Sequence, residues 1–259
     1  MTRLTLLVIL ITLSQTANSQ TRTVTVDSEI VWAGIDRAGD LFVVLANGDV
    51  QKYEKTGKKV GSHKFKSPPT LLDPLDGVRS FYYLRDGQRY GTMSYDFSTV
   101  EEKPLDPAFA ISPWLVCPSL HELWILDSAD FTIKKTRMNA MTISLESTLK
   151  HLPDKKMTDY LLIREYQNYV FLLDHSSGVH IFNSLGRFVR TLGEKNMNYF
   201  NFLGEEMYHV SGRELVFTNL YSLDRRISPL DGSFQFVLLN DDTLYGVTGK
   251  EIVILPFKP

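Results

Sequence analysis

The feature of this chain that most limits its fold is a repeat built from short strands and tight turns. After residue 20, apolar and β-branched residues occur in short runs, and Gly, Asp, Asn and Pro separate them. The separators include Asp86-Gly87-Gln88, in which glycine accepts positive φ and aspartate caps its own turn. No long stretch shows the period of a helix. The pattern therefore predicts an all-β protein built from hairpins.

Six copies of a unit with three strands and two turns follow one another along the chain. Their second strands align at a set of six residues: Leu41, Tyr90, Leu123, Val170, Leu215 and Leu244. The steps between these residues are 49, 33, 47, 45 and 29. A period near roughly 40–50 residues with several strands per copy is typical of a β-propeller, in which each copy forms one blade. We therefore expect a six-bladed β-propeller.

The segment that precedes the first copy supplies a way to close such a ring. The sixth copy stops after three strands, whereas Thr21 to Val26 alternates strictly and precedes the first copy. We expect this segment to pair with Glu251 to Leu255 as the outer strand of the last blade, because an open ring would expose an apolar edge. No linker or change of composition divides residues 20–259, so one domain is expected.

The first residues have the pattern of an export signal. Arg3 precedes an apolar run from Leu4 to Leu13, and Ala17-Asn18-Ser19 offers small residues for cleavage before Gln20. Ten helical residues are too short for a membrane span. We therefore predict a signal peptide at residues 1–19 and an exported protein, either periplasmic or secreted.

Charge and cysteine content limit the partners and the chemistry. The formal net charge is -2, which provides no global field for nucleic acid. The one cysteine, Cys117, cannot form an internal disulfide, and its apolar surroundings predict a buried side chain. We expect a monomer whose partner is a protein or another extracellular ligand, with no nucleic acid and no membrane span.

One segment carries a family resemblance. Tyr169 to Glu194 has an acidic residue closing the second strand (Asp174), a turn at Gly178, the pair Ile181-Phe182 and the run from Gly186 to Gly193. It resembles an NHL-type propeller repeat, which implies six blades. The resemblance implies little about activity, because such propellers include binding proteins, lyases, lactonases and structural modules. The general style of the chain is also similar to that of secreted propellers from Bacteroidetes-type bacteria.

A possible metal site follows from the repeat. The position four residues after each aligned residue reads Leu45, Ser94, Asp127, Asp174, Asn219 and Thr248. Equivalent positions of a propeller form a ring around the axis, so oxygen atoms of Asp127, Asp174 and Asn219 are candidate ligands for a hard cation such as calcium. The alternative is that these side chains cap the turns that follow their strands.

A second candidate site lies in the link between the fourth and fifth copies. Here amide and aromatic residues alternate: Asn198, Tyr199, Phe200, Asn201 and Phe202. Aromatic rings beside amides make an adaptable contact surface, and loops often carry function. We predict a binding face at this link; the alternative is that it packs over the mouth of the channel.

No assembled catalytic motif accompanies these features. The six histidines lack zinc-motif spacing, and neither a nucleophile elbow nor a glycine-rich phosphate loop occurs. The sequence therefore favours a non-catalytic binding or scaffold propeller. The alternative is a propeller hydrolase or lyase acting at a metal in the central channel.

Overall fold

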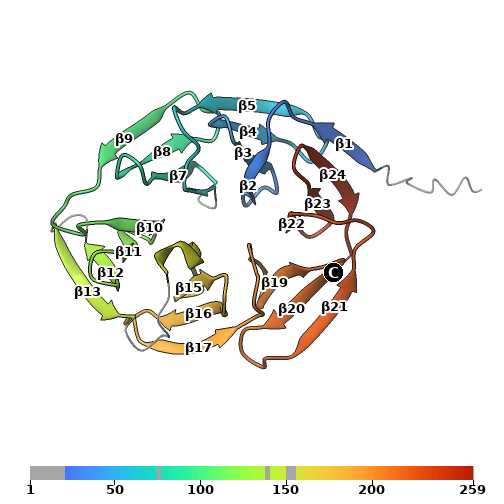
Figure 1. Cartoon of the computed structure of the whole chain (residues 1–259). Coiled ribbons are helices and arrows are strands. Elements are labelled where there is room, and N and C mark those ends of the chain that lie inside the picture. Colours follow the sequence, from blue (N-terminus) through green and yellow to red (C-terminus); the bar gives the residue numbers. More distant parts are fainter. Residues whose placement is uncertain (1–20, 75–76, 138–140, 150–155, 259) are drawn as a thin grey trace, which may run out of the picture.

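The described part of the chain forms a ring of six antiparallel sheets. The computed structural model describes residues 21–74, 77–137, 141–149 and 156–258. Each sheet has four strands, and the sheets surround one axis as the blades of a propeller (Figure 1). The predicted all-β, six-bladed propeller is confirmed. The predicted signal peptide lies outside the described residues, and no helix in the described part is long and apolar enough to cross a membrane.

The first three blades lie between residues 30 and 148. Blade one contains β2 (Ile30–Ile35), β3 (Leu41–Leu45), β4 (Asp49–Tyr53) and β5 (Lys59–Lys64). Blade two contains β6 (Leu71–Asp73), β7 (Arg79–Leu84), β8 (Arg89–Ser94) and β9 (Val100–Pro104). Blade three contains β10 (Pro113–Pro118), β11 (Glu122–Asp127), β12 (Thr132–Arg137) and β13 (Thr142–Thr148).

The other three blades complete the ring. Blade four follows the short 3₁₀ helix η2 (Met157–Asp159) and contains β14 (Tyr160–Tyr166), β15 (Tyr169–Asp174), β16 (Gly178–Asn183) and β17 (Phe188–Leu192). Blade five contains β18 (Asn201–Leu203), β19 (Glu206–Ser211), β20 (Glu214–Asn219) and β21 (Arg225–Pro229). Blade six contains β22 (Phe236–Leu239), β23 (Thr243–Val247), β24 (Glu251–Pro256) and β1 (Arg22–Thr25).

The N-terminal strand closes the ring, as predicted. Strand β1 pairs antiparallel with β24, with Arg22 opposite Ile254 and Thr25 opposite Glu251. The backbone N–H of Val26 continues the pairing by donating to the carbonyl of Lys250 at 3.0 Å. Blade six is thus built from both ends of the chain, which gives the last apolar strand a partner.

The alignment of the repeats was wrong in two blades. Tyr90 and Leu215 lie on β8 and β20, which are third strands rather than second strands. The reason is that the innermost strands of these blades, β6 and β18, have only three residues each and leave no clear run in the sequence. The second strands in fact begin at residues 41, 79, 122, 169, 206 and 243, in steps of 38, 43, 47, 37 and 37. The true repeat is more regular than the sequence suggested.

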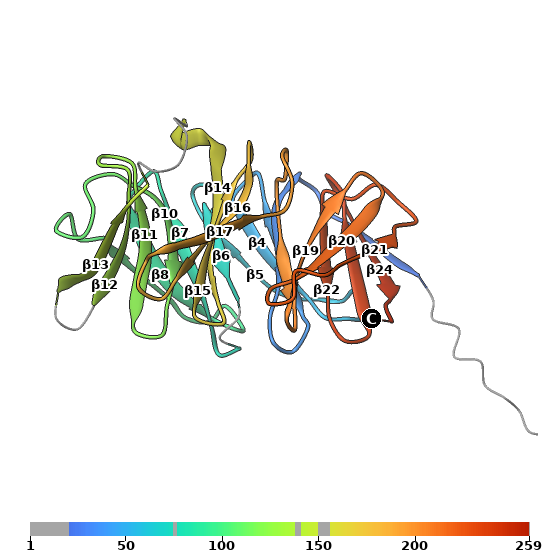
Figure 2. The ribbon, with the colours of Figure 1, turned by 90° about the horizontal axis from the view of Figure 1, so that it is seen from below.

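The propeller has two faces, which Figure 2 shows edge-on. We call upper face the side that carries the connections between blades and the hairpins between second and third strands; η2 lies there, at the top of Figure 2. The lower face carries the remaining hairpins and the C-terminal end of β24. Because strands alternate in direction, the second strands all end on the upper face and the third strands all end on the lower face.

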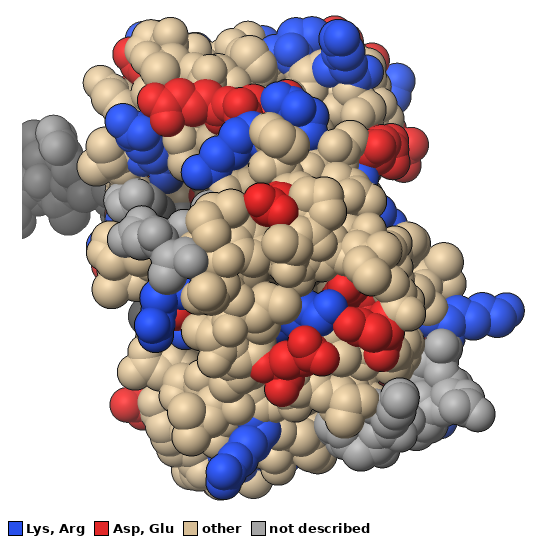
Figure 3. Space-filling model, turned by 90° about the vertical axis from the view of Figure 1, so that its left-hand side faces the viewer, with Lys and Arg blue, Asp and Glu red and all other residues tan. Residues whose placement is uncertain are grey.

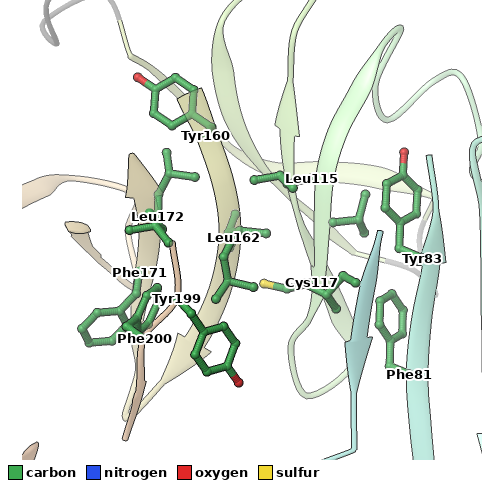
Figure 4. Close-up of a cluster of buried hydrophobic side chains, with 14 of the residues drawn as sticks. Phe81, Tyr83, Leu115, Cys117, Tyr160, Leu162, Phe171, Leu172, Tyr199 and Phe200 are labelled. Atoms are coloured by element: carbon green, nitrogen blue, oxygen red, sulfur yellow. The ribbon is translucent and has the colours of Figure 1, made fainter. Parts of the chain in front are cut away.

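The core lies between the blades. Every residue of β3 is buried, as expected for a strand covered on both sides. Around Cys117, side chains of three consecutive blades interdigitate, including Phe81, Leu162 and Phe171 (Figure 4). Cys117 is fully buried, as predicted. Gly178 begins β16 with φ +106°, and a Cβ there would lie 2.5 Å from the carbonyl oxygen of Leu192, so this turn needs glycine.

Candidate functional site

Asp127 anchors the upper face of blade three. The end of β11 brings its carboxylate against the backbone N–H groups of Ile111 and Ser112, each at 3.0 Å, and it also accepts from the backbone of Ala129. Lys134 of β12 donates to the same carboxylate at 2.8 Å, and both side chains are almost fully buried. Burial raises the pKa of Asp127, but these hydrogen bonds outweigh burial and place its pKa below the usual range. The aspartate therefore caps its turn and holds the incoming loop.

Asp174 occupies the matching position in blade four. Its carboxylate accepts from the backbone N–H and hydroxyl of Ser176, both at 2.8 Å, and from the hydroxyl of Ser177. A ring nitrogen of His180 lies 3.2 Å from the same carboxylate, and the other lies 2.8 Å from the hydroxyl of Thr191. His180 is 2% exposed. Ser177, which is half-buried, thus joins the buried His180 and Asp174 in one hydrogen-bonded network.

The third proposed metal ligand lies on the opposite face. Asn219 ends β20, a third strand, so it lies on the lower face, whereas Asp127 and Asp174 end second strands on the upper face. Its side-chain oxygen accepts from the backbone N–H groups of Tyr221 and Ser222, both at 2.9 Å. The expected common position of the three residues is therefore wrong for Asn219, and all three side chains cap turns. In the described ranges, no group of three or more His, Cys, Asp or Glu side chains could hold a metal ion.

Side chains from several blades fill the centre of the ring. Tyr199, in the connection between β17 and β18, donates its hydroxyl hydrogen to the carbonyl oxygen of Ala33 on β2 at 2.7 Å. Its ring lies edge-on to Phe236 of β22, with the centroids 5.1 Å apart. Arg164 of β14 donates to the side-chain oxygen of Asn201 on β18 at 2.7 Å. Inner strands of blades one, four, five and six thus meet at the centre of the ring. We call the group formed there by Arg164, Tyr199, Asn201 and Phe236 the plug.

The plug is a low-dielectric environment with a compensated cation. Arg164 is 6% exposed and interacts with Tyr199, Asn201 and Asp73 of β6. Burial raises the pKa of the Tyr199 hydroxyl, although the neighbouring Arg164 acts in the opposite direction. A buried guanidinium needs such partners, because an isolated buried charge is strongly destabilising. These described side chains therefore pack together at the centre of the ring.

The five residues of the predicted binding face have different environments. Asn198 is exposed on the upper face, whereas Tyr199 and Phe200 are buried. Asn201 is half-buried and holds Arg164. Phe202 stacks on Tyr166, with the ring centroids 4.0 Å apart and an interplanar angle of 3°. Tyr199 and Asn201 thus pack at the centre of the ring, whereas Phe200 and Phe202 pack against blade four. Asn198 alone is exposed, so the rest of the segment is buried or half-buried and does not form an exposed face.

The same connection borders a cavity on the upper face. This upper cavity, about 240 Å³ in volume, lies between blades five and six; its lining is Asn196, Asn198, Tyr199, Tyr208, His209, Val210, Gly212, Phe234, Gln235 and Val237. No carboxylate, lysine or arginine is among these residues. The hydroxyls of Tyr199 and Tyr208 already have backbone partners. The cavity therefore offers amide groups and aromatic surface but no charge.

His209 is an unusual member of this lining. Its side chain is 2% exposed, and neither ring nitrogen has a hydrogen-bond partner in the described part of the chain. Burial lowers the pKa of His209, although nearby Glu194 acts against this effect. The imidazole is therefore neutral at pH 7, with one unused donor and one unused acceptor. No pattern in the sequence marked this histidine.

A larger hollow region lies between blades two and three, and the sequence did not predict it. Three hollows of about 320, 460 and 360 Å³ follow one another. The first two share Arg79, Thr92 and Glu101, and the second and third share Tyr90 and Lys103. They therefore form one continuous groove, which we call the side cleft.

Comparisons with known proteins support the fold. Neither a family model nor the sequence of a curated protein matches the chain. Among solved structures, a streptogramin B lyase is similar, with a TM-score of 0.56 and 13% identity over 90% of this chain and 81% of that one. The extracellular domain of the putative one component system BT4673 from B. thetaiotaomicron has a TM-score of 0.56 and 11% identity. The match covers 88% of this chain and 33% of that chain, so this chain spans about a third of it.

A third similar structure is a WD40 domain. The WD40 domain of Neurospora crassa Pan2 has a TM-score of 0.56 and 9% identity over 90% of this chain and 80% of that one. Identities this low show that the propeller fold is shared and nothing finer. The function of this chain must therefore be argued from its own residues.

Proposed function

We propose that this chain is an exported, non-catalytic binding propeller that holds an uncharged group in its upper cavity. The observation that carries the proposal is the lining of that cavity. The side-chain amides of Asn196, Asn198 and Gln235 border it and make no hydrogen bond within the described ranges. Amides donate and accept at once, so they suit neutral polar groups such as hydroxyls and amides.

The size and composition of the cavity narrow the ligand. About 240 Å³ is below the roughly 300–1,000 Å³ typical of small-molecule sites. The occupant is therefore a small molecule or one unit of a longer chain. Phe234 adds an aromatic surface next to the amides. Export rests on the Arg3 to Ser19 pattern and places the ligand outside the cytoplasm.

The centre of the ring favours binding over chemistry in the channel. A hydrolase or lyase with a metal on the axis needs space where Tyr199 and Arg164 are packed. The oxygen atoms proposed as metal ligands hold turns on two different faces. The upper cavity, by contrast, is open to solvent and adjoins exposed amides.

The test is ligand binding with matched variants. Saturation-transfer NMR with a panel of neutral monosaccharides and neutral amino-acid amides should identify a binder, whereas acidic or basic relatives of the same compounds should bind at least tenfold more weakly. Asn198→Ala and Gln235→Ala should each weaken binding about tenfold, the effect of one lost hydrogen-bond partner. Lys195→Ala is the control, because Lys195 is exposed on the same connection but does not line the cavity. Binding that is unchanged by both amide variants would contradict the proposal.

A further inference from the structure

The side cleft has the shape of a groove for an extended chain. Its three hollows run in a row along the side of blade two that faces blade three. Residues at alternate positions of β7, β8 and β9 form its wall, since Phe81 lies opposite Thr92 and Thr92 lies opposite Glu101. Alternate residues of a strand share one face of the sheet. One face of blade two is therefore left uncovered toward its outer edge.

The cleft combines an apolar floor with unusually exposed apolar side chains. Phe81 and Tyr90 are buried in the floor, with their ring centroids 6.0 Å apart. Leu120, at the tip of the β10–β11 hairpin, is 88% exposed and borders the middle hollow. Tyr95 borders the first hollow and Met141 the third, and both are more than half exposed. Exposed apolar groups that gather along one groove indicate an interaction site.

Acidic side chains outnumber basic ones around the cleft. The carboxylates that line the three hollows are Asp96, Glu101, Glu102, Asp106 and Glu122, and the basic side chains are Arg79, Lys103 and His121. Glu102 and Glu122 are paired with Arg89 and Lys135, which lie outside the lining. The acidic excess therefore comes from Asp96 and Asp106, which form no ion pair with a described residue. Arg79 is paired with Glu101 at 3.5 Å, and both are more than half exposed. Figure 3 shows this side of the molecule, where charges of both signs lie close together at the top and again in the lower half. A partner that adds basic groups would complement the acidic excess.

The edge of blade two offers backbone groups beside the cleft. Strand β9 is the outermost strand of its sheet and pairs only with β8. Four of its five residues are exposed. An outer strand presents a row of unpaired N–H and C=O groups, which an extended peptide can extend as an added strand. In that arrangement alternate side chains of the peptide reach the floor of the cleft.

We propose that the side cleft binds an extended segment of a partner protein in which apolar and basic residues alternate. The apolar side chains occupy the hollows over Phe81 and Tyr90, next to Leu120. The basic side chains lie against Glu101 and the neighbouring carboxylates. This site is separate from the upper cavity, because the two share no lining residue.

The test uses a synthetic ten-residue peptide of alternating leucine and lysine, labelled at one end, and the full mature chain. Fluorescence anisotropy should show saturable binding, with at least tenfold weaker binding of the same peptide with glutamate in place of lysine. A peptide of the same composition in helical order should also bind at least tenfold more weakly. Hydrogen exchange should slow in Val100–Pro104 when the alternating peptide is bound.

Variants locate the site. Leu120→Lys and Glu101→Lys should each weaken peptide binding at least tenfold, because they add a repelling charge at exposed positions. Leu185→Lys is the matched control: Leu185 is 62% exposed at a hairpin tip of blade four, on the same lower face, and should leave affinity within twofold. Circular dichroism verifies the fold, and Leu120→Ser replaces Leu120→Lys if the latter is unstable.

Three outcomes would overturn the proposal. The first is no saturable binding of the alternating peptide, and the second is an equal loss of binding in Leu185→Lys. The third is concentration-dependent dimerisation or binding to anionic phosphatidylglycerol vesicles that Leu120→Lys abolishes while the peptide does not compete. That result would assign the cleft to a second copy of the chain or to a membrane surface.

Discussion

Blades three and four differ from blades two and five at the same structural positions. In blades three and four the second strands end in Asp127 and Asp174, and the innermost strands have six and seven residues. In blades two and five the second strands end in Leu84 and Ser211, and the innermost strands have three residues.

The side cleft and the upper cavity each lie beside one blade with a short inner strand. The side cleft borders blade two and the upper cavity borders blade five. The anchored turns are in blades three and four, where carboxylates join hairpins to incoming loops and third strands. The blades with long inner strands thus have their turns held by a buried aspartate, and the two hollows lie beside blades with short inner strands. The comparison predicts that stability and binding respond to substitutions in different blades.

The largest effect is expected from removing the anchor of blade three. Asp127→Ala leaves Lys134 buried with only Asp130 beside it and frees the backbone N–H groups of Ile111 and Ser112. Breaking a buried pair from one side typically costs about 3–5 kcal/mol. Urea unfolding measures the free-energy loss. Asp130→Ala is the control, because the side chain of Asp130 is 39% exposed and its loss should cost less than about 1 kcal/mol.

A second pair of variants separates charge from hydrogen bonding. Asp127→Asn keeps an oxygen for the turn but removes the charge that balances Lys134, so its cost should lie between those of Asp127→Ala and the parent chain. If Asp127→Ala lowers the free energy of unfolding no more than Asp130→Ala does, the buried aspartate does not anchor blade three. The distinction between blades three and four and blades two and five is then wrong.

An intermediate effect is expected in local stability. Amide hydrogens of β11 and β15 should exchange at least tenfold more slowly than those of β7 and β19, which corresponds to about 1.4 kcal/mol of opening free energy. The reason is that the anchored blades have longer inner strands and fixed turns. Mass-spectrometric hydrogen exchange on the mature chain measures this directly. Equal protection in all four strands would show that the ring opens as one unit.

The sequence predicted the architecture well because strand and turn chemistry is local. Glycine and aspartate at the turns, and the alternating segment from Thr21 to Val26, were enough to give six blades and their closure. The short strands β6 and β18 were missed, since three residues carry too little periodicity to recognise. That omission moved Tyr90 and Leu215 to the wrong strand.

The sites were harder to predict because they depend on how blades pack. The sequence singled out the connection at Asn198 and Tyr199, which does border the upper cavity. It did not indicate that Tyr199 would cross the axis to Ala33. The side cleft depends on the gap between two blades, which no motif encodes. The exposed Leu120 in a polar hairpin tip was its one local signal.

The smallest effect concerns His209 in blade five. Burial lowers its pKa in the folded chain, with Glu194 acting against this and Arg225 reinforcing it. In the unfolded chain the pKa is about 6.5. Above that pH His209 is neutral in both the folded and the unfolded chain, so it adds no pH dependence to the free energy of unfolding. Below it the unfolded chain binds a proton before the folded chain does, so stability must fall as the pH is lowered.

The variant His209→Gln removes this contribution, together with the lesser effect by which His209 lowers the pKa of Glu194. Urea unfolding at pH 7.5 and 5.5 should show a larger loss of stability for the parent than for His209→Gln. His121→Gln, at an exposed turn, should behave as the parent does. Equal losses of stability in the parent and in His209→Gln would contradict this prediction. They would mean that the protonated imidazole reaches a hydrogen-bond partner or solvent, so that blade five rearranges around His209. A compound that fills the upper cavity and binds the neutral imidazole should make stability depend more steeply on pH. The titration of His209 would then report on ligand binding in blade five, one of the two blades with a short inner strand.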